Sequence, residues 1–162
     1  MEFLPLIENK IIRRENLSKL ISSLKNESKK IVFTNGCFDI LHVGHLTYLA
    51  KAKSKGDILI VAINSDDSVK RLKGESRPIN NEISRAFSLA SLLFVDYVCA
   101  FEEDTPQNII ELICPDVLIK GGDYTIDNIV GADFVIKNHG KVETIDLVEG
   151  YSTTKIIEKL KK

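Results

Sequence analysis

The residues DILIVAIN, at positions 57–64, are apolar on both sides of an extended chain. Because successive side chains of a strand point to opposite faces, this run predicts a strand that is covered on both faces. Further short apolar runs occur at residues 30–35, 97–101, 116–120 and 141–147. Segments with apolar residues at helical spacing separate them. The alternation predicts βαβ units with right-handed crossovers, in a Rossmann-like three-layer α/β/α domain with a parallel sheet of about five strands.

The helical segments complete this expected order. Helices are predicted over residues 15–28, 44–56, 80–94, 127–138 and 153–162, and after Pro106. A chain of 162 residues is long enough to bury one substantial core, so the sequence predicts a single domain over residues 1–162. Residues 1–14 carry no clear pattern and are expected to form a loose N-terminal arm.

Charge and cysteine content narrow the classes of function. The formal net charge of −1 gives no general attraction to nucleic acid or to an anionic membrane, so neither is expected as a partner. The three cysteines have no CxxC spacing, and the first 16 residues do not resemble a signal peptide. No apolar stretch approaches the ~20 residues that span a bilayer. These features predict a cytoplasmic protein without a disulfide framework.

Polar, glycine-bearing segments follow several of the predicted strands. They read TNGCFD and HVGH after the first strand, NSDDSV after the second, KGGDY after DVLI, and VEGYSTT before the last helix. Ligands of open α/β sheets bind outside the carboxyl ends of the strands, where the strand order reverses. We therefore expect these segments to form one site.

The HVGH segment places His42 and His45 on either side of Gly44 at the start of a predicted helix. Zinc binding needs further ligands, and no other His or Cys pair supplies them, so no metal held by protein ligands is expected. Packing or capping is the ordinary role of a single histidine, and Cys37 is either a nucleophile or a small buried side chain. A third interpretation is a phosphate cradle, because a helix N-terminus with a glycine attracts anions and imidazoles donate hydrogen bonds to them. The chain has neither GxxxxGK[ST] nor GxGxxG, so this turn would have to replace those loops.

The segment FTNGCFDILHVGHLTYLAKAKSKGD resembles the HxGH segment of the nucleotidyltransferase superfamily. The segments NSDDSVKRLKGESRPINNEISRA, VDYVCAFEEDTP, PDVLIKGGDY and LVEGYSTTKII resemble, in order, the D-glycero-β-D-manno-heptose 1-phosphate adenylyltransferase (ADP-heptose synthase) family. The resemblance runs from about Lys30 to the C-terminus. It implies the HxGH nucleotidyltransferase fold, in the stand-alone form without the sugar-kinase domain that some relatives carry.

The resemblance also implies a reaction. An adenylyltransferase of this family transfers AMP from ATP to the heptose 1-phosphate, which gives ADP-heptose and pyrophosphate for lipopolysaccharide core or related glycan biosynthesis. ATP is then a co-substrate and Mg²⁺ a cofactor, small molecules are the partners, and a homo-oligomer (a dimer or larger) is expected. The acceptor phosphate is already anionic, so positioning and charge neutralisation matter more than a strong base.

The family's functional residues correspond to positions in this sequence. Catalytic roles are implied for His42, His45, Lys73 and Arg85. Binding of ATP is implied for Thr34, Asn35, Gly36, Phe38, Asp39, Gly44, Lys120, Gly121, Gly122, Asp123, Tyr151, Ser152, Thr153 and Thr154. Binding of the sugar phosphate is implied for Asp66, Lys70, Arg71 and Arg77.

Other interpretations of these residues stay open. Lys70, Arg71 and Lys73 also fit a solvated helix face, and the Ser-Thr-Thr run also fits a helix N-cap. The nearest alternative function is a cytidylyltransferase acting on glycerol 3-phosphate or a similar alcohol phosphate. Its family has an arginine in the RTxGISTT turn where this chain has Leu147, which disfavours it. A non-catalytic nucleotide-binding module is the second alternative.

Overall fold

The computed structural model describes residues 2–122, 124–146, 148 and 150–160. Its strands are β1 (Ile31–Gly36), β2 (Ile58–Asn64), β3 (Tyr97–Phe101), β4 (Val117–Gly121) and β5 (Lys141–Ile145). Its α-helices are α1 (Leu4–Glu8), α2 (Arg14–Asn26), α3 (Val43–Lys53), α4 (Asp66–Lys73), α5 (Glu82–Ala90), α6 (Gln107–Ile113), α7 (Ala132–Lys137) and α8 (Thr153–Leu160). A short 3-10 helix, η1, spans Ile126–Asn128.

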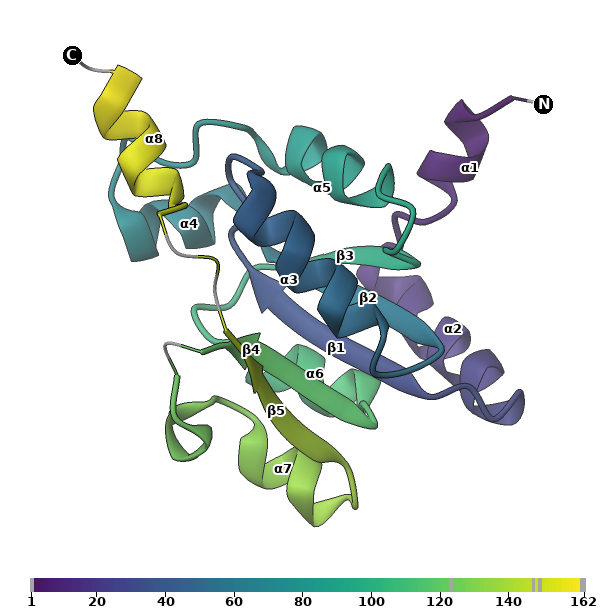
Figure 1. The fold of residues 1–162 in the computed structure, drawn as a ribbon. Coiled ribbons are helices and arrows are strands. Elements are labelled where there is room, and N and C mark those ends of the chain that lie inside the picture. Colours follow the sequence, from purple (N-terminus) through teal and green to yellow (C-terminus); the bar gives the residue numbers. More distant parts are fainter. Residues whose placement is uncertain (1, 123, 147, 149, 161–162) are drawn as a thin grey trace.

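The five strands form one parallel sheet in the order β3-β2-β1-β4-β5 (Figure 1). The chain moves outward from β1 to β3 and then returns to β4 on the other side of β1. The strand order therefore reverses at β1 and β4, and the carboxyl ends of these strands are where a ligand is expected. The predicted fold class, a Rossmann-like three-layer α/β/α domain, is confirmed.

Two apolar cores cover the two faces of the sheet. On one face α2, α6 and α7 pack over residues such as Phe33 and Ile60. On the other face α3 and α5 pack over residues such as Val61 and Ile63. All of β2 beyond its first residue is buried, as its two-sided apolar pattern predicts. In the described part of the chain, no helix is long and apolar enough to cross a bilayer.

Two parts of the chain differ from the sequence expectation. Residues 10–12 do not hang loose: the Ile12 amide donates to the Val98 carbonyl (2.8 Å), and the Val98 amide donates to the Lys10 carbonyl (2.8 Å). The edge strand β3 has unpaired backbone groups on its outer side, and this segment satisfies them. The single helix expected over residues 127–138 is wrong, because η1 and α7 are separated at Gly131, whose φ of +85° no α-helix contains.

Candidate active site

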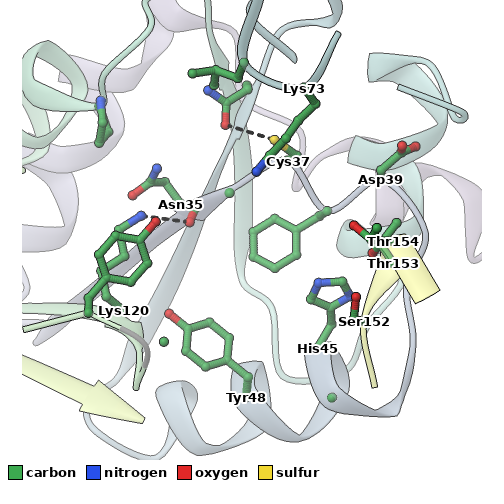
Figure 2. A pocket seen from close by; sticks show the side chains of 18 of the residues that line it. Asn35, Cys37, Asp39, His45, Tyr48, Lys73, Lys120, Ser152, Thr153 and Thr154 are labelled. Carbon is green, nitrogen blue, oxygen red and sulfur yellow. Dashed lines mark hydrogen bonds between the residues drawn. The ribbon is translucent and has the colours of Figure 1, made fainter. Parts of the chain in front are cut away.

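A cavity of about 630 Å³ opens at the carboxyl edge of the sheet (Figure 2). Most of the site residues implied by the resemblance lie on its wall. These are Asn35, Gly36, Phe38, Asp39, His42, Gly44, His45, Lys73, Arg77, Lys120, Gly121, Tyr151, Ser152, Thr153 and Thr154. The loops after β1, β2, β4 and β5 thus meet at one place, as the sheet-edge argument predicts.

The other implied residues lie elsewhere. Thr34, Asp66, Lys70, Arg71, Arg85 and Gly122 are described by the structure but do not line the cavity. Asp123 lies outside the described residues, as does Leu147. Thr34 is fully buried, and its hydroxyl hydrogen-bonds the hydroxyl of Tyr48 at 2.6 Å.

The HVGH turn begins helix α3 at the centre of the cavity. His42 is the N-cap residue, and its side chain makes no capping hydrogen bond. The imidazoles of His42 and His45 stack with their centroids 3.9 Å apart, and the Nδ1 atom of each is buried without a hydrogen-bond partner among the described residues. Capping therefore does not account for these side chains, and both rings are available to a ligand.

Burial keeps these histidines neutral in the free protein. It lowers the pKa of His42, and it lowers the pKa of His45 to about 4, with repulsion from His42 adding to the effect and the Ile40 carbonyl opposing it. The energetic cost of charging a stacked imidazole pair falls when a polyanion arrives, because the opposite charge favours protonation. The pair is suited to donating hydrogen bonds to phosphate oxygens.

Gly44 is required by close packing at this turn. A Cβ at Gly44 would come within 3.0 Å of His42 Nδ1 and within 3.4 Å of the Tyr151 Cβ. Contacts as short as 3.0 Å displace one of the partners, and here the partner is a histidine of the site. The sequence analysis explains Gly44 by the close approach of a ligand to the backbone. The contact with His42 gives a second reason for a glycine at this position.

We expect Gly44→Ala to lower kcat/KM for ATP by about tenfold, because it displaces the His42 ring from the position that faces the phosphates. The midpoint temperature of thermal unfolding is expected to change little or to rise, because alanine favours the helix more than glycine does. Steady-state kinetics and calorimetry measure the two effects. Val43→Ala, at the neighbouring exposed position, is the matched control and should leave both unchanged. Full activity of Gly44→Ala would contradict the packing argument.

Asp39 joins the loop after β1 to the loop before α5. Its buried carboxylate accepts hydrogen bonds from Arg77 Nε (2.6 Å) and from the amides of Ile79 (2.8 Å) and Asn80 (2.8 Å). Burial alone would raise the pKa of Asp39, but the two amides and the guanidinium outweigh it and hold the pKa below its usual value. Asp39 and Arg77 therefore form an ion pair on the cavity wall.

Arg85 has a structural position rather than a place on the cavity. Its side chain is 1% exposed, and it donates to the Asn80 carbonyl (3.0 Å, from Nε), the Cys37 carbonyl (2.7 Å, from Nη1) and Asp66 Oδ1 (2.8 Å, from Nη2). The acceptors belong to three different segments, which are the loop after β1, the loop before α5 and the first residue of α4. Each nitrogen of the guanidinium thus donates a hydrogen bond within the protein. Through these bonds Arg85 fixes the position of the loop that precedes HVGH.

The cations of α4 differ in their surroundings. Lys70 pairs with Asp67 one turn away at 3.2 Å, on the solvent side. Arg71 Nε donates to Asp104 Oδ1 at 2.7 Å. Lys73 alone of the three lies on the cavity wall, where Figure 2 shows it beside Cys37. The interpretation of a solvated helix face therefore fits Lys70, and a role at the site fits Lys73.

The start of α8 closes the cavity over the HVGH turn. The Thr153 hydroxyl donates to the Ile40 carbonyl at 3.3 Å, and the Tyr151 ring stacks on His42 at 6.3 Å between centroids. The Lys155 amide donates to the Ser152 hydroxyl at 3.3 Å, which is an N-cap interaction. Ser152 therefore caps α8, and Thr153 and Thr154 line the same cavity as the histidines.

Several residues on the wall had no individual binding role assigned from the sequence. They are Cys37, Tyr48, Asn64, Leu72, Asp104, Thr105, Pro106, Tyr124, Asn128, Val130 and Val148. Asn64 begins the NSDDSV segment, which the sheet-edge rule places at the site. Asp104 and Thr105 follow β3, and the same rule applied to that strand could have found them. Tyr48 lies inside helix α3 and gave no such signal. Burial raises the pKa of the Cys37 thiol, which favours the packing interpretation over the nucleophile.

The described residues do not build a Mg²⁺ site by themselves. Within the described part of the chain, no group of three or more His, Cys, Asp or Glu side chains is placed to hold a metal. The carboxylates of Asp39 and Asp104 on the wall are each bound to an arginine. Since Mg²⁺ in nucleotide sites is commonly held by substrate phosphates, the ion would have to come with the nucleotide.

Comparison with known proteins identifies the family. The family model described as cytidylyltransferase-like matches residues 33–159, which include the HVGH turn and the start of α8. The chain belongs to this family. It is a nucleotidyltransferase of the HxGH type.

Its curated relatives include proteins named "Bifunctional protein HldE". The chain is 58% identical over 154 residues to that of Campylobacter jejuni serotype O:6, covering 95% of this chain and 32% of the relative. It is 56% identical over 149 residues to that of Marinomonas sp., covering 92% of this chain and 31% of the relative. The chain therefore spans about a third of the length of these relatives.

Two solved structures resemble the fold. A lipopolysaccharide core biosynthesis protein from Thermoplasma volcanium has a TM-score of 0.60 and 29% identity, covering 76% of this chain and 99% of that one. Pantothenate synthetase from Thermus thermophilus has a TM-score of 0.61 and 14% identity, covering 91% of this chain and 67% of that one. At that identity the second likeness concerns the fold alone.

Proposed function

We propose that this chain is an adenylyltransferase that transfers AMP from ATP to D-glycero-β-D-manno-heptose 1-phosphate, for lipopolysaccharide core or related glycan biosynthesis. The observation that carries the proposal is the meeting of the stacked His42 and His45, the start of α8 and the cations of the cavity in one space. The identity of 58% to a protein named HldE supports the same assignment.

The chemistry suits these side chains. An oxygen of the acceptor phosphate attacks the α-phosphorus of ATP, and the bond from that phosphorus to the bridging oxygen of the pyrophosphate breaks. The electron pair leaves with pyrophosphate, and no proton has to be removed from an anionic acceptor. Catalysis then consists of alignment and charge neutralisation. His42 and His45 donate to phosphate oxygens, the start of α8 binds the leaving group, and Lys73 and Lys120 supply positive charge from either side.

We also propose the domain organisation, the cofactor, the partners, the cellular location and the assembly of the protein. Residues 1–162 act as a single nucleotidyltransferase domain. ATP is bound together with Mg²⁺, which its own phosphates carry to the site. The partners are small molecules and not nucleic acid or membrane. The protein acts in the cytoplasm as a homo-oligomer.

A nucleotide and acceptor panel tests the proposal. The purified protein is incubated with Mg²⁺ and either ATP or CTP, together with either the heptose 1-phosphate or glycerol 3-phosphate. Release of pyrophosphate and formation of the product are followed by a coupled assay and mass spectrometry. We expect turnover with ATP and the heptose 1-phosphate. Turnover only with CTP and glycerol 3-phosphate would assign the chain as a cytidylyltransferase, and no turnover with any pair would favour a non-catalytic nucleotide-binding module.

A further inference from the structure

The cavity has two lobes on opposite sides of β1. On the β4 side the wall is formed by Lys120, Tyr124, Asn128 and Val130, which we name the β4 lobe. On the β2 and β3 side it is formed by Asn64, Leu72, Lys73, Asp104, Thr105 and Pro106, which we name the β2 lobe. Figure 2 shows Lys120 beside Asn35 and Lys73 beside Cys37. The HVGH turn lines the same cavity as both lobes, so a nucleotide and its acceptor can approach the two histidines together.

The β4 lobe has the chemistry of a base site. Tyr124 presents a half-exposed aromatic ring, and Lys120 Nζ lies 5.5 Å from the centroid of this ring. Val130 adds apolar surface, and the amide of Asn128 adds a donor and an acceptor. Flat heteroaromatic groups stack on such rings, and an amide can hydrogen-bond to the edge of a base.

The β2 lobe has the chemistry of a polyhydroxylated ligand. The described residues of this lobe include no aromatic ring. They offer a carboxylate from Asp104, a hydroxyl from Thr105 and the buried amide of Asn64, which is 4% exposed. The Asn64 amide is fixed at both ends. Its Nδ2 donates to the Ser68 hydroxyl at 3.0 Å, and its Oδ1 accepts from the Cys37 thiol at 3.8 Å. Carboxylates and amides that are fixed in this way recognise sugar hydroxyls rather than a base face.

Charge separates the roles of Asp104 and Lys73. A carboxylate beside a bound phosphate would be repelled by it, so Asp104 suits the neutral hydroxyl groups of an acceptor. Lys73 is a cation with no hydrogen bond or ion pair recorded in the described structure, and it suits the phosphate of the acceptor. The two residues therefore match the two ends of a sugar phosphate.

Arg71 fixes Asp104 in this lobe. Arg71 Nε donates to Asp104 Oδ1 at 2.7 Å, and Arg71 Nη2 donates to the Glu102 carbonyl at 2.6 Å. Arg71 itself does not line the cavity. Its position outside the wall and its contact with one carboxylate oxygen leave the other oxygen of Asp104 for a ligand.

We infer that Asp104 recognises hydroxyl groups of the acceptor sugar, and that Arg71 is a positioning residue that acts through Asp104. This inference rests on the proposed function, since it concerns the acceptor of the same reaction. It gives Arg71 an indirect role in place of the direct substrate contact that the resemblance implies.

Kinetics with separate variation of the two substrates test the inference. We expect Asp104→Ala to raise the KM of the heptose 1-phosphate by about tenfold or more, because a charge-assisted hydrogen bond is lost, with the KM of ATP unchanged. Arg71→Gln should raise the acceptor KM by a smaller factor, and should have no further effect when combined with Asp104→Ala. Asp67→Ala is the matched control. Asp67 is an exposed carboxylate on α4, the helix that carries Arg71, and it pairs with Lys70 outside the cavity.

The outcomes separate this inference from the proposed function. No pyrophosphate release by the unmodified protein with any phosphate acceptor overturns the proposed function. Release by the unmodified protein, together with an unchanged acceptor KM in Asp104→Ala, overturns the role of Asp104. Additive effects of Arg71→Gln and Asp104→Ala overturn the positioning role of Arg71, because independent contacts add and dependent ones do not.

Discussion

Replacing His45 with alanine is expected to lower kcat by about 100-fold or more, because the imidazole stabilises charge that develops in the transition state. The ring lies in the cavity, stacked on His42 at 3.9 Å between centroids, with Phe38 edge-on at 5.3 Å. Its Nδ1 atom is buried without a protein partner among the described residues. Its hydrogen bond to the Ile40 carbonyl is lost on substitution, but its Nδ1 makes no such bond to the described residues, so most of the loss should appear in turnover.

The measurement is pyrophosphate release at saturating ATP and acceptor, with thermal unfolding followed in parallel. His139→Asn is the matched control: His139 is exposed, it lies outside the cavity, and asparagine accepts its φ of +65°. The control is expected to keep full activity. A His45→Ala protein that folds normally and turns over at the original rate would show that the pair has only a packing role.

The order of the elements could be predicted because the apolar pattern of a strand indicates which of its faces are buried. In β2 every residue after the first is buried, and the sequence is apolar on both faces. A strand of this kind needs helices on both sides, so the three-layer fold follows from one segment. The failure at residues 127–138 has an equally local cause. Gly131 takes a left-handed conformation between η1 and α7, and apolar spacing on either side of it concealed the break.

The candidate site could be predicted in part for a related reason. Residues that follow strands directly, such as Asn35 and Lys120, reach the sheet edge by topology alone, and they lie on the cavity wall. Residues on helices depend on tertiary packing for their direction. Arg71 and Lys73 are two positions apart on α4, yet only Lys73 reaches the cavity. Residue type and order predict both as phosphate ligands, and only the orientation of the helix separates them.

Arg85 is the residue for which the resemblance and the geometry differ most. The resemblance implies contact with the substrate. The structure instead places the guanidinium in the interior, bound to two backbone carbonyls and to Asp66. A buried cation with satisfied donors is costly to remove, because its acceptors are left without a partner.

We expect Arg85→Met to lower the free energy of unfolding by about 3 kcal/mol. It keeps an unbranched apolar stem but leaves the Cys37 and Asn80 carbonyls and Asp66 without their donors. In a chain of this size that corresponds to a fall in Tm of very roughly 6–12 °C. Urea unfolding and calorimetry measure it. Arg13→Met makes the same substitution at an arginine whose side chain is 82% exposed, and it should change stability little.

Kinetics of Arg85→Met distinguish a structural role, in which Arg85 holds the loop before HVGH, from direct contact with the substrate. If Arg85 holds the loop before HVGH, its removal displaces His42 and His45 together, and kcat falls for every acceptor that the enzyme uses. If Arg85 instead binds the acceptor phosphate, Arg85→Met would unfold at the original temperature and would show only a raised acceptor KM. Arg85→Lys sharpens the contrast. A single ammonium cannot reach three acceptors in different segments, so a structural role predicts a loss of stability here too, whereas a phosphate contact predicts substantial rescue.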